Sequence, residues 1–120
     1  MLFRPMKKDG VRPVVADTAT GLGLRARDYV ADEHGRVGPG RGGISVCPHN
    51  KDNIPDEFLV YPIWVIDTAH LEAQLTFRQD SPTHGVIEAA ASMSPDDLRM
   101  AIVATREVWV EIAAQAQGRP

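Results

Sequence analysis

The sequence predicts an α+β domain in which short strands come first and a helix comes last. Short apolar runs separated by turn residues fill the first two-thirds of the chain, and a helical hydrophobic period is confined to its end. Strands that precede a helix, instead of alternating with helices, favour the α+β class over a βαβ fold. The 120 residues match the commonest length of one domain, so we expect a single domain over residues 1–120.

The first strand is expected at Leu2–Pro5, on a sheet edge, because a proline donates no hydrogen bond to a neighbouring strand. A second short apolar run covers residues 11–16. Residues 16–27 are ambiguous, because two glycines oppose a long helix whereas two leucines need burial.

The middle of the chain is typical of a hairpin followed by a glycine-rich loop and a series of strands. Residues 28–37 resemble a hairpin with "DEHG" as its turn, and "GPGRGG" follows directly. A turn of helix that passes into a strand is expected at residues 71–77. Further strands are expected at residues 44–47, 58–67 and 85–90.

The end of the chain carries the clearest helix signal. Ser94 is a good N-cap, Pro95 occupies the first helical position, and two aspartates place negative charge on the first turn. Apolar residues then recur at spacings of three and four, which predicts one helix of about 20 residues that packs a single stripe on the sheet. The stripe comprises Leu98, Ile102, Thr105, Trp109, Ile112 and Ala116.

The composition excludes several classes of function. With 13 basic and 16 acidic residues and a formal charge of −3, the chain has no basic face for a nucleic-acid backbone, so nucleic-acid binding is not expected. Its apolar runs are far shorter than the roughly 20 residues of a membrane span, and its N-terminus lacks the apolar core of a signal peptide. Cys47 is the single cysteine and cannot form an intrachain disulfide. We expect a protein that works in a reducing cytosol, its own or that of another cell.

Spacing also argues against a metal site and against the common nucleotide sites. The four histidines are dispersed and none forms H-x-x-x-H, so we expect no metal. Neither a P-loop nor a G-x-G-x-x-G between strand and helix is present. Ser45 lies outside a G-x-S-x-G motif and has no identifiable general base, and Cys47 is interpreted as a small buried thiol.

Two charged residues in strand-like runs each allow two interpretations. Glu88, which with Asp80 flanks His84, interrupts the apolar run "GVIEAAA"; it is either an exposed edge charge or a carboxylate that points into a cleft. Arg4 is either a surface residue or a group that projects its five donors into a pocket and binds phosphate or carboxylate.

Several segments, taken in order, resemble one family of toxins. They are "LFRP", "GPGRGGISV", the aromatic strand "YPIWVID", and "DSPTHGVIEAAASM" ahead of the final helix. This order is similar to that of the small type VI secretion toxins of the Tse-two family, which have an ADP-ribosyltransferase-like fold. The resemblance covers most of the chain and implies short, mostly antiparallel strands in two packed sheets with a long C-terminal helix.

The resemblance further implies which residues act on NAD. In ADP-ribosyltransferases the first strand offers an arginine or histidine to the NAD phosphate or ribose, and a second strand carries a serine that supports the nicotinamide pocket. These positions fall on Arg4 and Ser45. A late acidic residue stabilises the oxocarbenium-like state, and that position is open between Glu88 and His84. The chain departs from the family at Ile44, where a second hydroxyl often precedes the serine.

Other residues are compatible with NAD as a substrate. Gly42 and Gly43 leave room for a pyrophosphate or an amide to approach backbone N–H groups. Tyr61 and Trp64 offer rings on which a flat base can stack, although Trp64 within "IWVI" is more typical of a core aromatic.

The function implied is that of an NAD-dependent toxin that transfers ADP-ribose to a target in the cytoplasm of a competing cell. Such a toxin needs no metal, is exported by a contact-dependent system without a signal peptide, and is neutralised by a cognate immunity protein. The alternative is a non-catalytic interaction protein, such as an immunity or antitoxin partner. A third option, an enzyme on phosphorylated RNA ends, is disfavoured by the sparse lysines.

Overall fold

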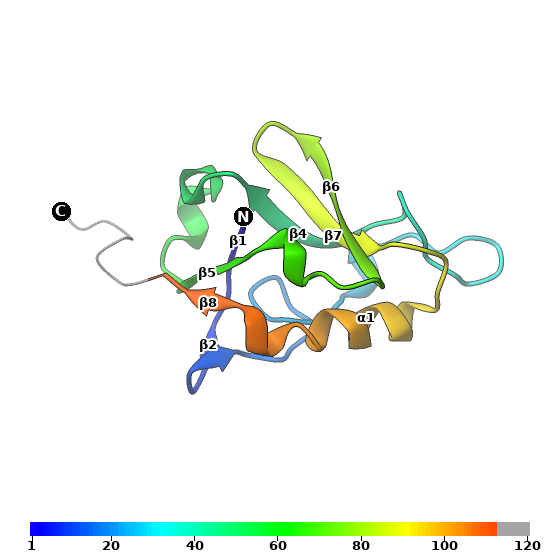
Figure 1. Ribbon diagram of the computed structural model, residues 1–120, viewed down its shortest axis with the longest axis horizontal. Helices are drawn as coiled ribbons and strands as arrows, with labels where there is room; N and C mark the ends of the chain where they lie inside the picture. The colour runs from blue at the N-terminus through cyan, green and yellow to red at the C-terminus, as the bar shows by residue number, and fades with distance from the viewer. Residues whose placement is uncertain (113–120) are drawn as a thin grey trace.

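A six-stranded antiparallel sheet runs through the middle of the molecule (Figure 1). The structure is a computed structural model and describes residues 1–112. The strand order is β6-β7-β4-β1-β5-β8, and a separate two-stranded ribbon joins β2 to β3. The strands are β1 (Leu2–Pro5), β2 (Lys8–Asp9), β3 (Arg12–Pro13), β4 (Gly43–Pro48), β5 (Ile63–Ile66), β6 (Leu75–Ser81), β7 (His84–Ala89) and β8 (Val110–Glu111).

One α-helix, α1 (Pro95–Val103), accompanies the sheet. Single turns of 3₁₀-helix occupy several connections, and the mixture of helix with an antiparallel sheet confirms the predicted α+β class. Within residues 1–112 no helix is long and apolar enough to cross a membrane. The 3₁₀ turns are Ala26–Asp28, Lys51–Asn53, Asp56–Phe58, Thr68–His70 and Arg106–Val108.

β4 joins the two halves of the sheet. Its residues 43–46 pair with β7, whereas Cys47 and Pro48 pair with β1. The expectation of two packed sheets is therefore wrong for the described residues, because the hydrogen bonds continue through β4 into one sheet and leave only the small β2-β3 ribbon apart.

β1 lies in the interior of the sheet, between β4 and β5, and not at the predicted edge. The proline is tolerated because the next amide along, that of Met6, donates to the Pro62 carbonyl at 3.0 Å, so the missing donor of Pro5 does not interrupt the bonding to this neighbour. β1 also stops pairing with β4 after Phe3, opposite Cys47, so the two strands are not paired beyond that point.

The main hydrophobic core lies between one face of the sheet and α1. Alternate residues of the strands, among them Ile44, Trp64 and Ile87, are buried on this face. They meet Leu98 and Ile102 of α1, so each contributes roughly 1.5–3 kcal/mol through removal of its apolar surface from water. A smaller cluster of Cys47, Ile54 and Ile63 covers the opposite face near β1.

The C-terminal helix is much shorter than predicted. α1 ends at Val103, and a 3₁₀ turn leads into β8, which pairs with β5. Trp109 is completely buried, and its indole Nε1 donates to the Thr105 hydroxyl at 2.9 Å, while that hydroxyl donates to the Ile102 carbonyl. The apolar spacing that resembled one long helix is thus divided between a helix and a strand. Of the predicted stripe, Ala116 lies outside the described residues.

The hairpin predicted at residues 28–37 is correct only in its turn. The Gly35 amide donates to the Asp32 carbonyl and the Asp32 amide to the Arg36 carbonyl, which closes the turn, but beyond these residues the two arms do not pair with each other. Tyr29 instead bridges Gly42, and Val37 bridges Met93. The strand predicted at residues 58–67 is shortened to Ile63–Ile66 because a 3₁₀ turn and Pro62 precede it.

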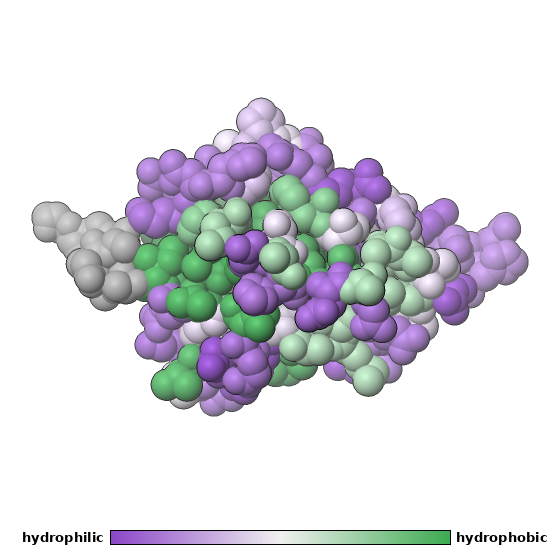
Figure 2. Space-filling model, viewed as in Figure 1, coloured by the Kyte–Doolittle hydropathy of each residue, from purple (hydrophilic) through white to green (hydrophobic). Residues whose placement is uncertain are grey.

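Hydrophobic residues on the surface gather over one part of the molecule. In the view of Figure 2 they lie around β5 and β8, whereas the β6-β7 hairpin is covered mainly with hydrophilic residues. Val110 of β8 is 61% exposed. The polar part of the surface is therefore the part that carries the β6-β7 hairpin.

Candidate functional site

A cavity of about 230 Å³ lies beside the point where β1 and β4 stop pairing. Three residues predicted from sequence to form the active site, Arg4, Ser45 and His84, line this cavity together. They come from β1, β4 and β7, so the order of these strands in the sheet brings them together although up to 80 residues separate them in sequence. Sequence reasoning missed Arg25, Phe3 and Phe58, which also line the cavity.

Arg4 is a buried cation held by neutral partners. Its side chain is 5% exposed, and its Nη1 and Nη2 donate to the carbonyls of Ser45 at 2.7 Å and Gly21 at 2.9 Å. No carboxylate of residues 1–112 forms an ion pair with it, and its buried Nε has no hydrogen-bond partner. Burial lowers the pKa of Arg4 to about 10, partly opposed by the charge of Asp28, so the guanidinium stays charged near neutral pH.

A second guanidinium contributes to the same cavity. Arg25 lines it and pairs with Asp28, with 2.8 Å between Nη2 and Oδ1. The Arg25 amide also donates to Asp28 at 2.8 Å, which fixes this segment as a capped 3₁₀ turn. The two arginines and one carboxylate leave the region with more positive than negative charge, which suits an anionic ligand.

Ser45 and His84 face the cavity from neighbouring strands. Ser45 is exposed and pairs with Val86, and His84 lies two residues before Val86 on β7. Residues two apart on a strand share a face, so the two side chains lie on the same side of the sheet. The Nδ1 of His84 lies 2.7 Å from the Oδ1 of Asp80.

Cys47 lines the cavity as well, but as an unreactive thiol. It is 7% exposed, which confirms the predicted small buried cysteine, and its Sγ donates to the Asn53 carbonyl at 3.5 Å. Burial raises its pKa, with a weaker opposing effect from the charge of Arg4. The thiolate required of a nucleophile is therefore disfavoured.

Glu88 fits neither of its two predicted positions. It is 1% exposed on the interior strand β7, so it is not an edge charge, and it does not line the cavity. Its carboxylate accepts from the Gly40 amide at 2.9 Å and from Arg78 Nε at 2.9 Å, and Arg78 covers it from the solvent side. These partners occupy the carboxylate and leave His84 as the candidate that faces the cavity.

The glycines predicted to contact NAD are explained by contacts within the chain. A Cβ at Gly42, where φ is +107°, would collide with the backbone of Asp28. A Cβ at Gly43 would collide with the Ile87 carbonyl of the paired strand β7. The lack of side chains at these positions is thus required by close backbone packing, without any ligand.

Neither aromatic residue predicted to stack on NAD reaches the cavity. Trp64 is 1% exposed in the main core and donates from Nε1 to the Met6 carbonyl at 2.9 Å, so it is a core residue. Tyr61 is half-buried with its ring centroid 6.4 Å from that of Phe58. Phe58 and Phe3 instead form the aromatic walls of the cavity.

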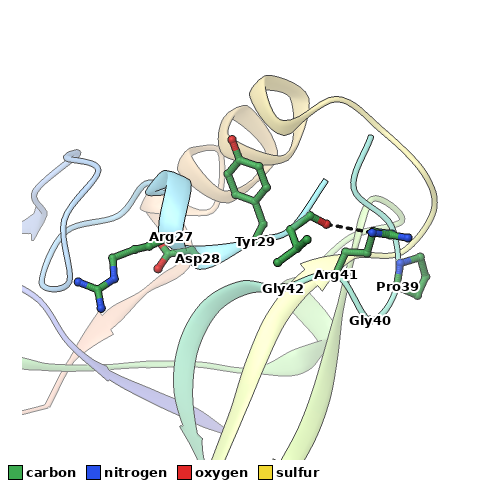
Figure 3. Close-up of a pocket in the computed structure, with 8 residues that line it drawn as sticks. Arg27, Asp28, Tyr29, Pro39, Gly40, Arg41 and Gly42 are labelled. Atoms are coloured by element: carbon green, nitrogen blue, oxygen red, sulfur yellow. Dashed lines mark hydrogen bonds between the residues drawn. The ribbon is translucent and has the colours of Figure 1, made fainter. Parts of the chain in front are cut away.

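A larger and more open hollow, of about 600 Å³, lies over the glycine-rich loop. Figure 3 shows Arg27 and Arg41 pointing to opposite sides of it and Tyr29 pointing toward α1. Arg41 Nη1 donates to the Val30 carbonyl at 3.3 Å. Because these side chains diverge, the hollow presents no set of groups to one ligand.

No family model, curated protein or solved structure matches this chain. Its candidate site therefore rests on its own geometry. Within the described part of the chain, no group of three or more histidine, cysteine or acidic residues is placed to hold a metal ion. The cavity presents two guanidiniums that suit an anion, two aromatic walls, a hydroxyl and an imidazole.

Proposed function

We propose that this chain is an NAD-consuming toxin domain with an ADP-ribosyltransferase-like fold. The observation that carries the proposal is the convergence of Arg4, Ser45 and His84 on one cavity. The resemblance to the Tse-two family assigns Arg4 and Ser45 to NAD and leaves the third position open between His84 and Glu88. Within residues 1–112 the antiparallel sheet supports that fold, although the helix α1 is shorter than the resemblance implies.

The cavity suits the nicotinamide end of NAD. Its volume of about 230 Å³ is below the roughly 300–1,000 Å³ of sites that enclose a whole small molecule, so the adenosine half would lie outside. Phe3 and Phe58 would contact the flat nicotinamide ring, and Arg4 and Arg25 would attract the pyrophosphate. A buried guanidinium without a carboxylate partner gains most from such an anion.

Expression in a bacterial cytoplasm tests the proposal. We expect the wild-type chain to arrest growth and to deplete NAD, and co-expression of its gene neighbour, the proposed immunity protein, to restore growth. Ser45→Ala removes a hydroxyl that lines the cavity and should restore growth with a normal circular dichroism spectrum. Arg41→Lys, outside the cavity, is the matched control and should stay toxic. Full toxicity of Ser45→Ala and of Arg4→Met together would contradict the proposal.

The second candidate, a non-catalytic interaction protein, is favoured by exposed apolar residues beside the cavity wall. Leu59 and Val60 are 45% and 81% exposed and directly follow Phe58. Exposed apolar side chains of this kind serve as anchors in protein interfaces. This candidate predicts a chain that neither binds NAD nor affects growth, so the same expression experiment separates the two functions.

A further inference from the structure

A β-bulge near the end of the β6-β7 hairpin places a carboxylate against His84. The strands pair in register from Leu75↔Ala89 to Gln79↔Gly85, and the next pair is Ser81↔His84, so Asp80 is an extra residue on β6. Its Oδ1 lies 2.7 Å from His84 Nδ1. Bulges of this type redirect a side chain and are frequent beside active sites.

The contact with Asp80 determines which nitrogen of His84 is free. An ionised carboxylate can only accept a hydrogen bond, so in the neutral imidazole of His84 the hydrogen lies on Nδ1 and Nε2 keeps its lone pair. His84 also lines the cavity, on the same face of the sheet as Ser45. The geometry therefore directs a proton acceptor to the place where Arg4 and Arg25 would hold an anionic substrate.

We propose that His84 is the general base of this site and that Asp80 is its positioning residue. The inference rests on the proposed function and specifies how the nucleophile is activated. The sequence alone identified no general base near Ser45, and His84 fills that role in the folded chain. Glu88 cannot take this role because Gly40 and Arg78 occupy its carboxylate.

The step is written here for water, the nucleophile when no acceptor is bound. The water oxygen bonds to the anomeric carbon of the nicotinamide ribose while the bond from that carbon to the nicotinamide nitrogen breaks. Nicotinamide leaves as a neutral base with the electron pair of that bond. The water proton passes to Nε2 of His84 and then to solvent, so NAD and water yield ADP-ribose, nicotinamide and one proton.

Nicotinamide release by the purified full chain, with NAD as the probe, tests the inference. General-base catalysis contributes about 100- to 10,000-fold, so His84→Ala and Asp80→Ala should each lower the rate by about 100-fold or more. NAD binding, measured by calorimetry, should be retained in both. His34→Ala and Asp97→Ala, at exposed positions outside the cavity, are matched controls and should keep the wild-type rate.

A spectroscopic readout separates positioning from a structural role of Asp80. In ¹⁵N-histidine-labelled protein we expect His84 to carry its hydrogen on Nδ1 in the wild type. Asp80→Ala removes the acceptor that holds the hydrogen on Nδ1, so we expect the hydrogen to redistribute between Nδ1 and Nε2 and the fixed lone pair on Nε2 to be lost.

Each outcome decides between distinct accounts. Near-wild-type nicotinamide release by His84→Ala would overturn the general base and leave the proposed function standing. A slow Asp80→Ala variant with an unchanged tautomer would overturn the positioning role of Asp80. A wild-type chain that neither binds nor cleaves NAD would overturn the proposed function and this inference with it.

Discussion

Arg4 and Glu88 are charged side chains buried in the same sheet, but their surroundings are opposite. Glu88 has a guanidinium partner and a backbone amide, so its charge is compensated within the chain. Arg4 has only carbonyl partners and an Nε without a partner. A buried charge with its own counterion is sufficiently explained by structure, whereas an uncompensated one that lines a cavity indicates a binding site.

The largest effect is expected at Gly43, which pairs with Glu88 across β4 and β7. In Gly43→Ala the new methyl group collides with the Ile87 carbonyl, and neither strand can move without breaking the pairing. We expect a loss of about 4 kcal/mol in the free energy of unfolding, measured by urea denaturation. Gly10→Ala, where φ is +66° but no atom lies near, is the control for glycine backbone strain and should lose far less. Equal losses would contradict the packing explanation.

Removal of the Glu88 carboxylate should also destabilise the fold. Glu88→Ala leaves the Gly40 amide without its acceptor, Arg78 without its partner and an apolar gap in the sheet, so we expect a loss of about 3 kcal/mol. Arg78 is half-exposed and regains water, which keeps the loss below that at Gly43. If Glu88→Ala unfolds in urea as the wild type does, Glu88 does not stabilise the fold and the contrast with Arg4 fails.

Removal of the Arg4 charge should have a small effect on stability. Arg4→Met keeps the aliphatic stem and relieves the cost of a buried charge, but it leaves the Ser45 and Gly21 carbonyls without a donor. These effects oppose each other, so we expect the free energy of unfolding to stay within about 1 kcal/mol of the wild type. A loss as large as that of Glu88→Ala would mean that both buried charges are structural.

A further effect is a pH dependence of stability that belongs to Arg4. Burial lowers its pKa to about 10, so above that pH the unfolded chain retains a proton that the folded chain has lost. The unfolded state then binds more protons, and the contribution of Arg4 to stability rises with pH. Between about pH 9 and about pH 11 the wild type should gain stability relative to Arg4→Met in urea unfolding. A constant difference between the two would contradict the lowered pKa.

The sequence predicted local features better than the ends of elements. Ser94 is the N-cap of α1 as expected, with its hydroxyl accepting from the Asp97 amide at 3.0 Å. The predicted end of α1 was wrong because Trp109 is apolar at a helical spacing. The long-range pairing of β8 with β5, which follows the 3₁₀ turn, takes this part of the chain out of the helix. Apolar residues at spacings of three and four do not distinguish a helix that continues from a turn followed by a strand.

The candidate site was predictable only in part. Arg4, Ser45 and His84 were identified through the resemblance, and the structure brings them together. Arg25 is the N-cap of one 3₁₀ turn and Phe58 the last residue of another, and the position of such short turns depends on tertiary packing, so no local pattern pointed to them. The ion pair between Arg78 and Glu88 forms because β6 pairs with β7 in one particular register. That register could not be read from the sequence.

Calorimetric titration of NAD into the wild-type chain and Arg4→Met tests the central claim most directly. If the uncompensated guanidinium is a binding group, the wild type binds NAD and Arg4→Met, folded to the same stability, loses that binding by about 100-fold or more. Glu88→Gln, which removes the other buried charge, should retain it if folded. Equal affinity of the wild type and Arg4→Met, or no NAD binding by the wild type, would contradict the account.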